Sequence, residues 1–219
     1  MIIIANWKLN LTLAEIKSWV LEFNAFSSSY SLNKVTPVIC PSFIYVSYLK
    51  ENLLNAHIGT QDSSEFLEGE YTGEVSAKQL KDYISYSIIG HSERRKNFSE
   101  TDDIVQKKAR LCVENQITPV ICVSALEQAA ALKSFRDIII ALEPLENIGS
   151  GIPAKPEFIE DTAKKIVDII PSAKVLYGGS VTAENAKGFS KLKNISGFLV
   201  GGESLNPVYF INIIKKCDM

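Results

Sequence analysis

Residues 84–95 read ISYSIIGHSERR, and this stretch carries the first strong indication of the fold. It opens with an apolar strand candidate at residues 84–89 and stops at Gly90. His91, a hydroxyl group, a carboxylate and two arginines follow at once. A histidine at the end of a buried strand, where a helical turn can begin, is well placed for chemistry on a polar substrate. Taken alone, the stretch is equally typical of a capped turn followed by a solvated run of charges.

The same alternation of an apolar run and a helical segment recurs along the chain. Most runs are apolar throughout, as expected for parallel strands that are buried on both faces. The strand candidates are residues 2–7, 35–40, 56–61, 84–89, 117–123, 137–142, 173–177 and 195–200. Between them, helical spacing links Val105, Ala109, Cys112 and Val113, and Pro156 suits a first helical position.

Eight strand and helix units predict an α/β protein with a closed (β/α)8 TIM barrel. In a chain of 219 residues each unit has about 27 residues, which is near the small end for this fold. A doubly wound open sheet is the alternative that the same alternation allows. No composition shift or linker-like stretch divides the sequence, so we expect a single barrel domain over residues 1–219.

Composition narrows the class of protein. The net charge of −2 gives no electrostatic case for binding nucleic acid or an anionic membrane. No apolar run reaches the ~18–20 residues of a membrane span, and no signal-like segment precedes residue 2. The four cysteines, Cys40, Cys112, Cys122 and Cys217, match neither a zinc pattern nor a disulfide framework. We therefore expect reduced thiols, no metal and a cytoplasmic location.

Polar residues stand at the ends of several strand candidates. Asn6 and Lys8 end the first, His91 follows the fourth, and Glu143 follows the sixth. In a barrel these ends converge on one face, so the four side chains are expected to share a cavity. Glu143 lies between a very apolar run and Pro144, and the partial desolvation expected there suits a general base. Considered singly, Glu143 could be a carboxylate at the rim, Lys8 a surface lysine and His91 a structural histidine.

Glycines follow the last two strand candidates, as Gly178-Gly179-Ser180 and as Gly201-Gly202. Glycine lets backbone N–H groups approach a ligand closely, and a following helix adds a partial positive charge. These two loops are the usual place for a phosphate in a (β/α)8 barrel. The pairs therefore predict an anion site, with simple tight turns as the alternative.

Together these motifs resemble triosephosphate isomerase along the whole chain. The resemblance is carried by Asn6-Trp7-Lys8, Tyr71-Thr72-Gly73-Glu74-Val75-Ser76, Ile89-Gly90-His91-Ser92-Glu93-Arg94-Arg95, Glu143-Pro144, Ile148-Gly149-Ser150-Gly151, Tyr177-Gly178-Gly179-Ser180-Val181 and Leu199-Val200-Gly201-Gly202. It implies a (β/α)8 barrel that interconverts glyceraldehyde 3-phosphate and dihydroxyacetone phosphate through an enediolate, without cofactor or metal.

The resemblance also implies a role for each matching catalytic residue. Glu143 matches the general base, and His91 matches a neutral imidazole that donates to the substrate oxygens. This family is itself the standard example of that pair. Lys8 matches the cation that binds the substrate, and Asn6 matches its hydrogen-bonding neighbour. Glu93 matches a supporting carboxylate that pairs with the active-site lysine.

Further matches concern the phosphate and the subunit contact. Gly149, Ser180, Gly201 and Gly202 match the phosphate-binding backbone, and residues 144–154 match a lid over the site. Thr72 matches a supporting residue at the tip of a loop that inserts into a neighbouring subunit. The resemblance therefore implies a homodimer or homotetramer, with residues 62–76 in the interface.

Three features depart from the commonest pattern of the family. Leu-Glu-Asn stands at residues 145–147 in place of a Val-Trp-Ala hinge, and Ile152 replaces a lysine. These two changes resemble compact archaeal-type enzymes, some of which are tetramers, whereas the phosphate loops resemble the bacterial pattern. Glu203 stands where a small residue is usual, and we expect its carboxylate to point to solvent.

Two other functions remain as alternatives at this point. Another phosphosugar barrel, such as an aldolase or epimerase, needs a Schiff-base lysine or a metal cluster. With only His57 and His91 in the sequence, metal ligation by histidine is poorly supported. A catalytically impaired relative acting as a binding protein is the second alternative. The presence of Lys8, His91 and Glu143 argues against it.

Overall fold

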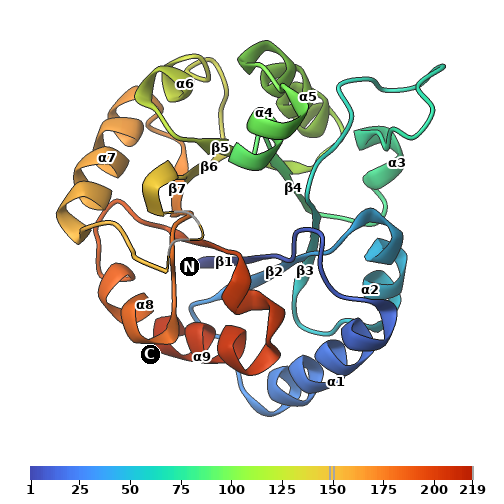
Figure 1. The fold of residues 1–219 in the computed structure, drawn as a ribbon, viewed down its shortest axis with the longest axis vertical. Coiled ribbons are helices and arrows are strands. Elements are labelled where there is room, and N and C mark those ends of the chain that lie inside the picture. The colour runs from blue at the N-terminus through green and yellow to red at the C-terminus, as the bar shows by residue number, and fades with distance from the viewer. Residues whose placement is uncertain (148, 150, 219) are drawn as a thin grey trace.

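The computed structural model describes residues 1–147, 149 and 151–218. Within them, parallel strands close into a barrel in the order β1 to β8 (Figure 1). The strands are β1 (Ile2–Asn6), β2 (Thr36–Cys40), β3 (His57–Thr60), β4 (Tyr86–Ile89), β5 (Thr118–Val123), β6 (Ile139–Leu142), β7 (Lys174–Tyr177) and β8 (Gly197–Val200). All the expected strands are present, each one or two residues shorter than predicted. Pairing of β1 with β8 closes the ring and excludes the open sheet.

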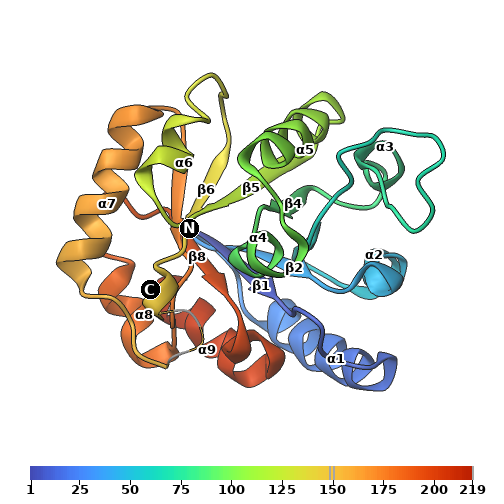
Figure 2. The same ribbon diagram turned by 45° about the horizontal axis from the view of Figure 1, so that its top comes forward.

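Helices surround the barrel on all sides, as both ribbon views show (Figures 1 and 2). They are α1 (Leu13–Ser29), η1 (Phe43–Tyr45), α2 (Val46–Asn52), α3 (Ala77–Leu80), α4 (Ser92–Phe98), α5 (Asp102–Glu114), α6 (Leu126–Ala130), η2 (Leu145–Asn147), α7 (Pro156–Ile169), α8 (Ala183–Phe189), η3 (Gly202–Leu205) and α9 (Pro207–Asp218). Among these helices none is long and apolar enough to cross a membrane. Pro156 opens α7 as expected.

One detail of the apolar face predicted for the helix that contains Val105 and Val113 is wrong. Val105, Ala109 and Cys112 are buried, but Val113 is 47% exposed. Val113 follows Val105 by eight residues, which is about 80° around a helix beyond two full turns. This rotation carries Val113 from the apolar face to its solvent edge.

Alternate residues of the strands fill two separate parts of the core. Ile3, Ala5 and Trp7 point outward and pack with the helices. The barrel interior is filled by Ile2, Ile4, Val38, Cys40, Ile88, Val120, Cys122, Ile139, Ala141, Leu176 and Leu199. Burial of both faces explains why the strands read as continuous apolar runs. It also leaves the carboxyl ends of the strands as the place where polar side chains collect.

A long segment projects from the ring of helices just before α3 (Figures 1 and 2). It spans residues 62–76, and its tip is exposed at Tyr71 and Thr72. The rings of Phe66 and Tyr71 stack with centroids 3.6 Å apart, and Lys78 donates to Glu68 across 2.5 Å. These contacts give the projecting segment a shape of its own away from the barrel.

Candidate active site

A small cavity opens at the carboxyl ends of β1, β4, β6, β7 and β8. It is lined by Asn6, Lys8, His91, Glu143, Gly149, Gly151, Gly178, Gly179, Ser180, Val181, Thr182, Leu199, Gly201, Gly202 and Glu203. Its volume of about 210 Å³ is below the roughly 300–1,000 Å³ of sites for drug-sized ligands, so it suits a small substrate. The four predicted catalytic residues and the four predicted phosphate-binding residues all lie in this lining.

His91 and Glu143 form the buried base of the cavity. Nε2 of His91 lies 3.0 Å from Oε1 of Glu143, and the backbone N–H of Ser92 donates to Oε2 across 2.9 Å. Nδ1 of His91 accepts from the backbone N–H of Glu93 across 3.2 Å. A nitrogen that accepts a hydrogen bond carries no proton, so this pattern assigns a neutral ring with its proton on Nε2.

Glu143 is positioned by the strands on either side of it. Its N–H donates to the carbonyl of Val123 on β5 across 2.8 Å. On the other side, a Cβ added to Gly178 would stand 3.2 Å from Cγ of Glu143 and 3.2 Å from the carbonyl oxygen of Leu142. Glycine at 178 therefore leaves the space that the carboxylate side chain occupies.

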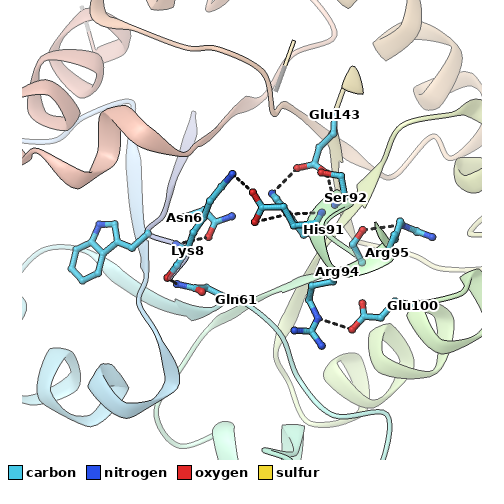
Figure 3. A network of polar contacts seen from close by, with 12 residues as sticks. Asn6, Lys8, Gln61, His91, Ser92, Arg94, Arg95, Glu100 and Glu143 are labelled. Carbon is cyan, nitrogen blue, oxygen red and sulfur yellow. Dashed lines mark hydrogen bonds and ion pairs between the residues drawn. The ribbon is translucent and has the colours of Figure 1, made fainter. Parts of the chain in front are cut away.

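Lys8 reaches the cavity from a strained stretch of backbone after β1. Its φ is +53°, in the left-handed region that non-glycine residues avoid at a cost of about 1–3 kcal/mol. Nε2 of Gln61 holds this conformation by donating to the Lys8 carbonyl across 2.9 Å and to the Cys40 carbonyl across 3.0 Å. Oδ1 of Asn6 accepts from the Lys8 N–H across 3.2 Å. Figure 3 shows Gln61 beside Asn6 and Lys8 at the mouth of the barrel.

Nζ of Lys8 lies 2.5 Å from Oε1 of Glu93, as expected for a supporting carboxylate. Both side chains remain partly exposed, whereas His91 and Glu143 are buried. We call Lys8, His91, Glu93 and Glu143 the open cluster, because all its members except Glu93 line the cavity. A ligand that enters the cavity can therefore exchange partners with these groups.

The predicted phosphate side of the cavity is lined by residues from three loops. Gly149 stands between residues that lie outside the described part of the chain, which include Ser150 of the expected lid. Oγ of Ser180 donates to the carbonyl of Asn147 across 2.8 Å, so the β7 loop contacts the start of the lid. The N–H of Ala154 donates to the buried hydroxyl of Tyr177 across 2.9 Å, and burial raises the pKa of that hydroxyl.

Glu203 lies closer to the site than a solvent-exposed helix start suggests, and the expected direction of its carboxylate stays a prediction. It is partly buried and belongs to the lining of the cavity, next to Gly201 and Gly202. It stands in the first turn of η3, as expected.

A second set of charges lies behind the cavity and was not predicted. Nζ of Lys108 contacts Asp62 at 2.8 Å and Glu100 at 2.5 Å. Arg94 contacts the same two carboxylates at 2.8 Å and 2.6 Å. We call Asp62, Arg94, Glu100 and Lys108 the sealed cluster. Figure 3 shows its Arg94 and Glu100 lying away from Glu143.

Burial dominates the electrostatics of the sealed cluster. It raises the pKa of Asp62 to about 6, with help from Glu100, although Lys108 and Arg94 oppose the shift. Oε2 of Glu100 is buried without a hydrogen-bond partner among the described residues. Arg94 follows Glu93 in α4, so one short helix contributes to both clusters.

Sequence reasoning missed several residues that shape the site. Gln61 ends the third strand candidate, and the rule that strand ends carry function would have found it. Lys108 lies three residues after Val105, on the apolar face of α5, where a lysine requires a buried partner. Ser92 acts through its backbone N–H, and no residue type signals such a contact.

Thr72 stands apart from the cavity. It is exposed at the tip of the projecting segment and is absent from the cavity lining of the described chain. In the described ranges, no group of three or more His, Cys, Asp or Glu residues is arranged to hold a metal ion. The chemistry available from these residues is acid–base transfer by Glu143 and His91 next to a cation.

Comparison with known proteins agrees with this geometry. The family model described as "Triosephosphate isomerase" matches residues 1–217. Proteins named triosephosphate isomerase from Malacoplasma penetrans and Dictyoglomus turgidum are 38% and 37% identical, each over 98% of this chain and over 97% and 98% of their own lengths. The one from Buchnera aphidicola is 36% identical over 97% of this chain and 95% of its own. The chain therefore belongs to the triosephosphate isomerase family.

Proposed function

We propose that the open cluster interconverts dihydroxyacetone phosphate and glyceraldehyde 3-phosphate, with Glu143 as the base. The observation that carries the proposal is the His91 ring, which accepts at Nδ1 and presents Nε2–H beside Glu143 in the cavity that Lys8 also lines. A neutral imidazole donor, a buried carboxylate and a cation are the groups that an enediolate mechanism requires. Triosephosphate isomerase is the established example of such a histidine.

The reaction moves one proton from C1 to C2 through Glu143 and one proton from the oxygen on C1 to the oxygen on C2 through His91. The Glu143 carboxylate removes a proton from C1 of dihydroxyacetone phosphate, and the C–H electrons form a C1–C2 double bond. The carbonyl oxygen on C2 gains the negative charge and accepts from Nε2–H of His91. The proton then returns to C2 while the C1 hydroxyl proton passes through His91 to the oxygen on C2, so C1 becomes the aldehyde and C2 carries the hydroxyl group. For this sequence the Glu143 carboxylate must exchange its contact with His91 for the substrate carbon.

Lys8 and Asn6 have electrostatic roles in this proposal. The ammonium group of Lys8 is partly exposed in the cavity and exchanges Glu93 for the substrate anion. Oδ1 of Asn6 holds the backbone turn that aims Lys8. Backbone at Gly149, Ser180, Gly201 and Gly202 binds the phosphate group at the far side of the same cavity.

Isomerisation in heavy water tests the mechanism. Proton transfer through Glu143 predicts glyceraldehyde 3-phosphate with deuterium at C2, because a carboxylic acid exchanges its proton with solvent before returning it. A product with no deuterium would indicate a direct hydride shift and would contradict the proposal. Glu143→Gln should slow product formation and labelling by the same large factor, while circular dichroism checks that the variant is folded.

Exposed apolar side chains and the projecting segment support a homo-oligomer in which Thr72 lies at the contact between subunits. Large apolar side chains are exposed in the segments that follow β1, β2 and β4, at Leu9 (96%), Ile44 (76%) and Phe98 (65%). Large exposed apolar side chains are typical of subunit contacts when they gather on one face of a protein. The projecting segment 62–76 adjoins them in the barrel order and offers a shaped loop for a second copy.

Sedimentation analysis tests the oligomer. We expect at least a dimer, and a mass of two or four chains decides between dimer and tetramer. Ile44→Arg should dissociate the assembly, whereas Leu21→Arg, which changes an equally exposed leucine on α1, should not. A fully active monomer would contradict the proposal.

We place this activity in the cytoplasm. The four cysteines are free and buried in the described chain, which favours a reducing compartment. Burial raises the pKa of Cys112 to about 11, so its reactive thiolate form is suppressed.

A further inference from the structure

Two tryptophans from different elements donate to the same backbone oxygen. Nε1 of Trp7, directly after β1, lies 3.2 Å from the carbonyl oxygen of Ser204. Nε1 of Trp19, on α1, lies 3.0 Å from the same oxygen. All three residues are buried. A carbonyl oxygen has two lone pairs, so the two indoles saturate it.

The oxygen that they hold belongs to the turn behind the predicted phosphate site. Gly201, Gly202 and Glu203 line the cavity on one side of this turn. On its other side, Ser204 folds back and donates to the Gly201 carbonyl, through N–H across 2.9 Å and through Oγ across 2.6 Å. The turn is therefore thin, with the cavity in front and the indoles behind.

The indoles are themselves fixed by an aromatic cluster. The rings of Trp7 and Trp19 meet edge to face with centroids 5.0 Å apart. Phe23 stacks on Trp19 at 5.2 Å, and Phe210 of α9 lies at 5.9 Å. Rigid donors in a packed core position an acceptor more closely than mobile surface groups do. Trp7 also stands between Asn6 and Lys8, so it joins the catalytic end of β1 to the turn.

We propose that Trp19, together with Trp7, positions the Gly201–Ser204 turn for binding the phosphate group. These are positioning residues, because neither is among the residues that line the cavity. This inference rests on the proposed function only in naming phosphate as the ligand. The two indole N–H groups fix the position of the turn, and the turn becomes mobile when both are lost.

Trp7→Phe, Trp19→Phe and the double variant test the proposal, since phenylalanine keeps a ring and removes only the donor. Losing one of two donors should raise KM and the inhibition constant of inorganic phosphate by up to about fivefold. The double variant should show a larger increase, with kcat changed by no more than about twofold. Phe23→Leu is the matched control, because it disturbs the same aromatic cluster without touching Ser204.

Hydrogen exchange of residues 198–206 gives a second readout that does not depend on activity. We expect faster exchange in each tryptophan variant, and about tenfold or more in the double variant, with Phe23→Leu close to wild type. The proposal would be overturned if the exchange rates and the phosphate inhibition constants of all variants, Phe23→Leu included, changed only in proportion to the loss of overall stability. If the wild type is inactive but the tryptophan variants still exchange faster at residues 198–206, the proposed function is contradicted. The positioning role of the indoles then stands. If the double variant does not fold, the single variants decide.

Discussion

The open cluster and the sealed cluster are built from the same kinds of group, yet their surroundings differ. Each has two carboxylates and at least one cation, and neighbouring residues of α4, Glu93 and Arg94, contribute one to each. In the sealed cluster Lys108 and Glu100 are about 5% and 4% exposed, and every cation contacts both carboxylates. In the open cluster the Lys8 ammonium has one carboxylate partner and faces a cavity.

The difference indicates how one fold uses charge for two purposes. Groups that pair with each other, with Arg94 partly exposed and the other three largely buried, hold α4, α5 and the start of the projecting segment in one arrangement. Groups that keep a replaceable partner are available to a substrate. Changes in the open cluster should therefore affect rate, and changes in the sealed cluster should affect stability.

Of four substitutions that compare the clusters, Lys8→Met should have the largest effect on rate. Removing the cation that faces the developing negative charge should lower kcat/KM by ~10²–10³-fold, by analogy with the loss of one preorganised donor. The free energy of unfolding should change little, because the Lys8–Glu93 pair is partly exposed. Steady-state kinetics and urea unfolding measure the two quantities. If Lys8→Met lowered the free energy of unfolding but not kcat/KM, the open cluster would behave like the sealed cluster, which would contradict the division between them.

Lys108→Met is the corresponding change in the sealed cluster. It leaves two buried carboxylates sharing Arg94, which should cost about 3–5 kcal/mol of unfolding free energy. Activity per folded molecule should stay within about threefold, because Lys108 does not line the cavity. Lys107→Met is the control, since Lys107 is exposed and its pair with Glu65 at 3.2 Å should contribute ~0–1 kcal/mol. Equal effects of the two substitutions would contradict a buried network.

Asp62→Asn sharpens the comparison through its pH dependence. With its pKa raised to about 6, Asp62 binds a proton more tightly in the folded than in the unfolded chain. Wild type should therefore gain stability relative to the variant as pH falls from about 6 to about 4, by up to ~1.4 kcal/mol per pH unit. The gain should level off below the ordinary pKa of the carboxyl. A difference that grows with rising pH would mean that Lys108 and Arg94 outweigh burial.

Glu203→Gln should have the smallest effect and acts on the cavity alone. Removing a carboxylate next to the predicted phosphate site should lower KM and the inhibition constant of inorganic phosphate by about two- to fivefold. Glu184→Gln is the control, because Glu184 is exposed on α8 and does not line the cavity. Phosphate constants that are the same in both variants would show that the Glu203 carboxylate has no influence on anion binding.

The barrel and the meeting of Lys8, His91 and Glu143 were predictable because both follow from order along the chain. Strand ends of a closed parallel barrel share one face whatever the details of packing. The sealed cluster depends instead on the pairing of Asp62 with Lys108, 46 residues apart. Likewise, the contact of Trp19 with Ser204 spans 185 residues. Contacts of this kind depend on how helices pack on the barrel, which hydrophobic periodicity alone does not determine.

Two carboxylate-to-amide variants, Glu143→Gln and Glu100→Gln, test the account most directly when measured side by side. We expect Glu143→Gln to lose ~10²–10⁴-fold or more in kcat for glyceraldehyde 3-phosphate while its unfolding free energy stays within about 1 kcal/mol of wild type. Glu100→Gln should lose about 3–5 kcal/mol of stability and keep its kcat within about threefold. An active Glu143→Gln enzyme, or a Glu100→Gln variant that is inactive yet fully stable, would contradict the division between the two clusters.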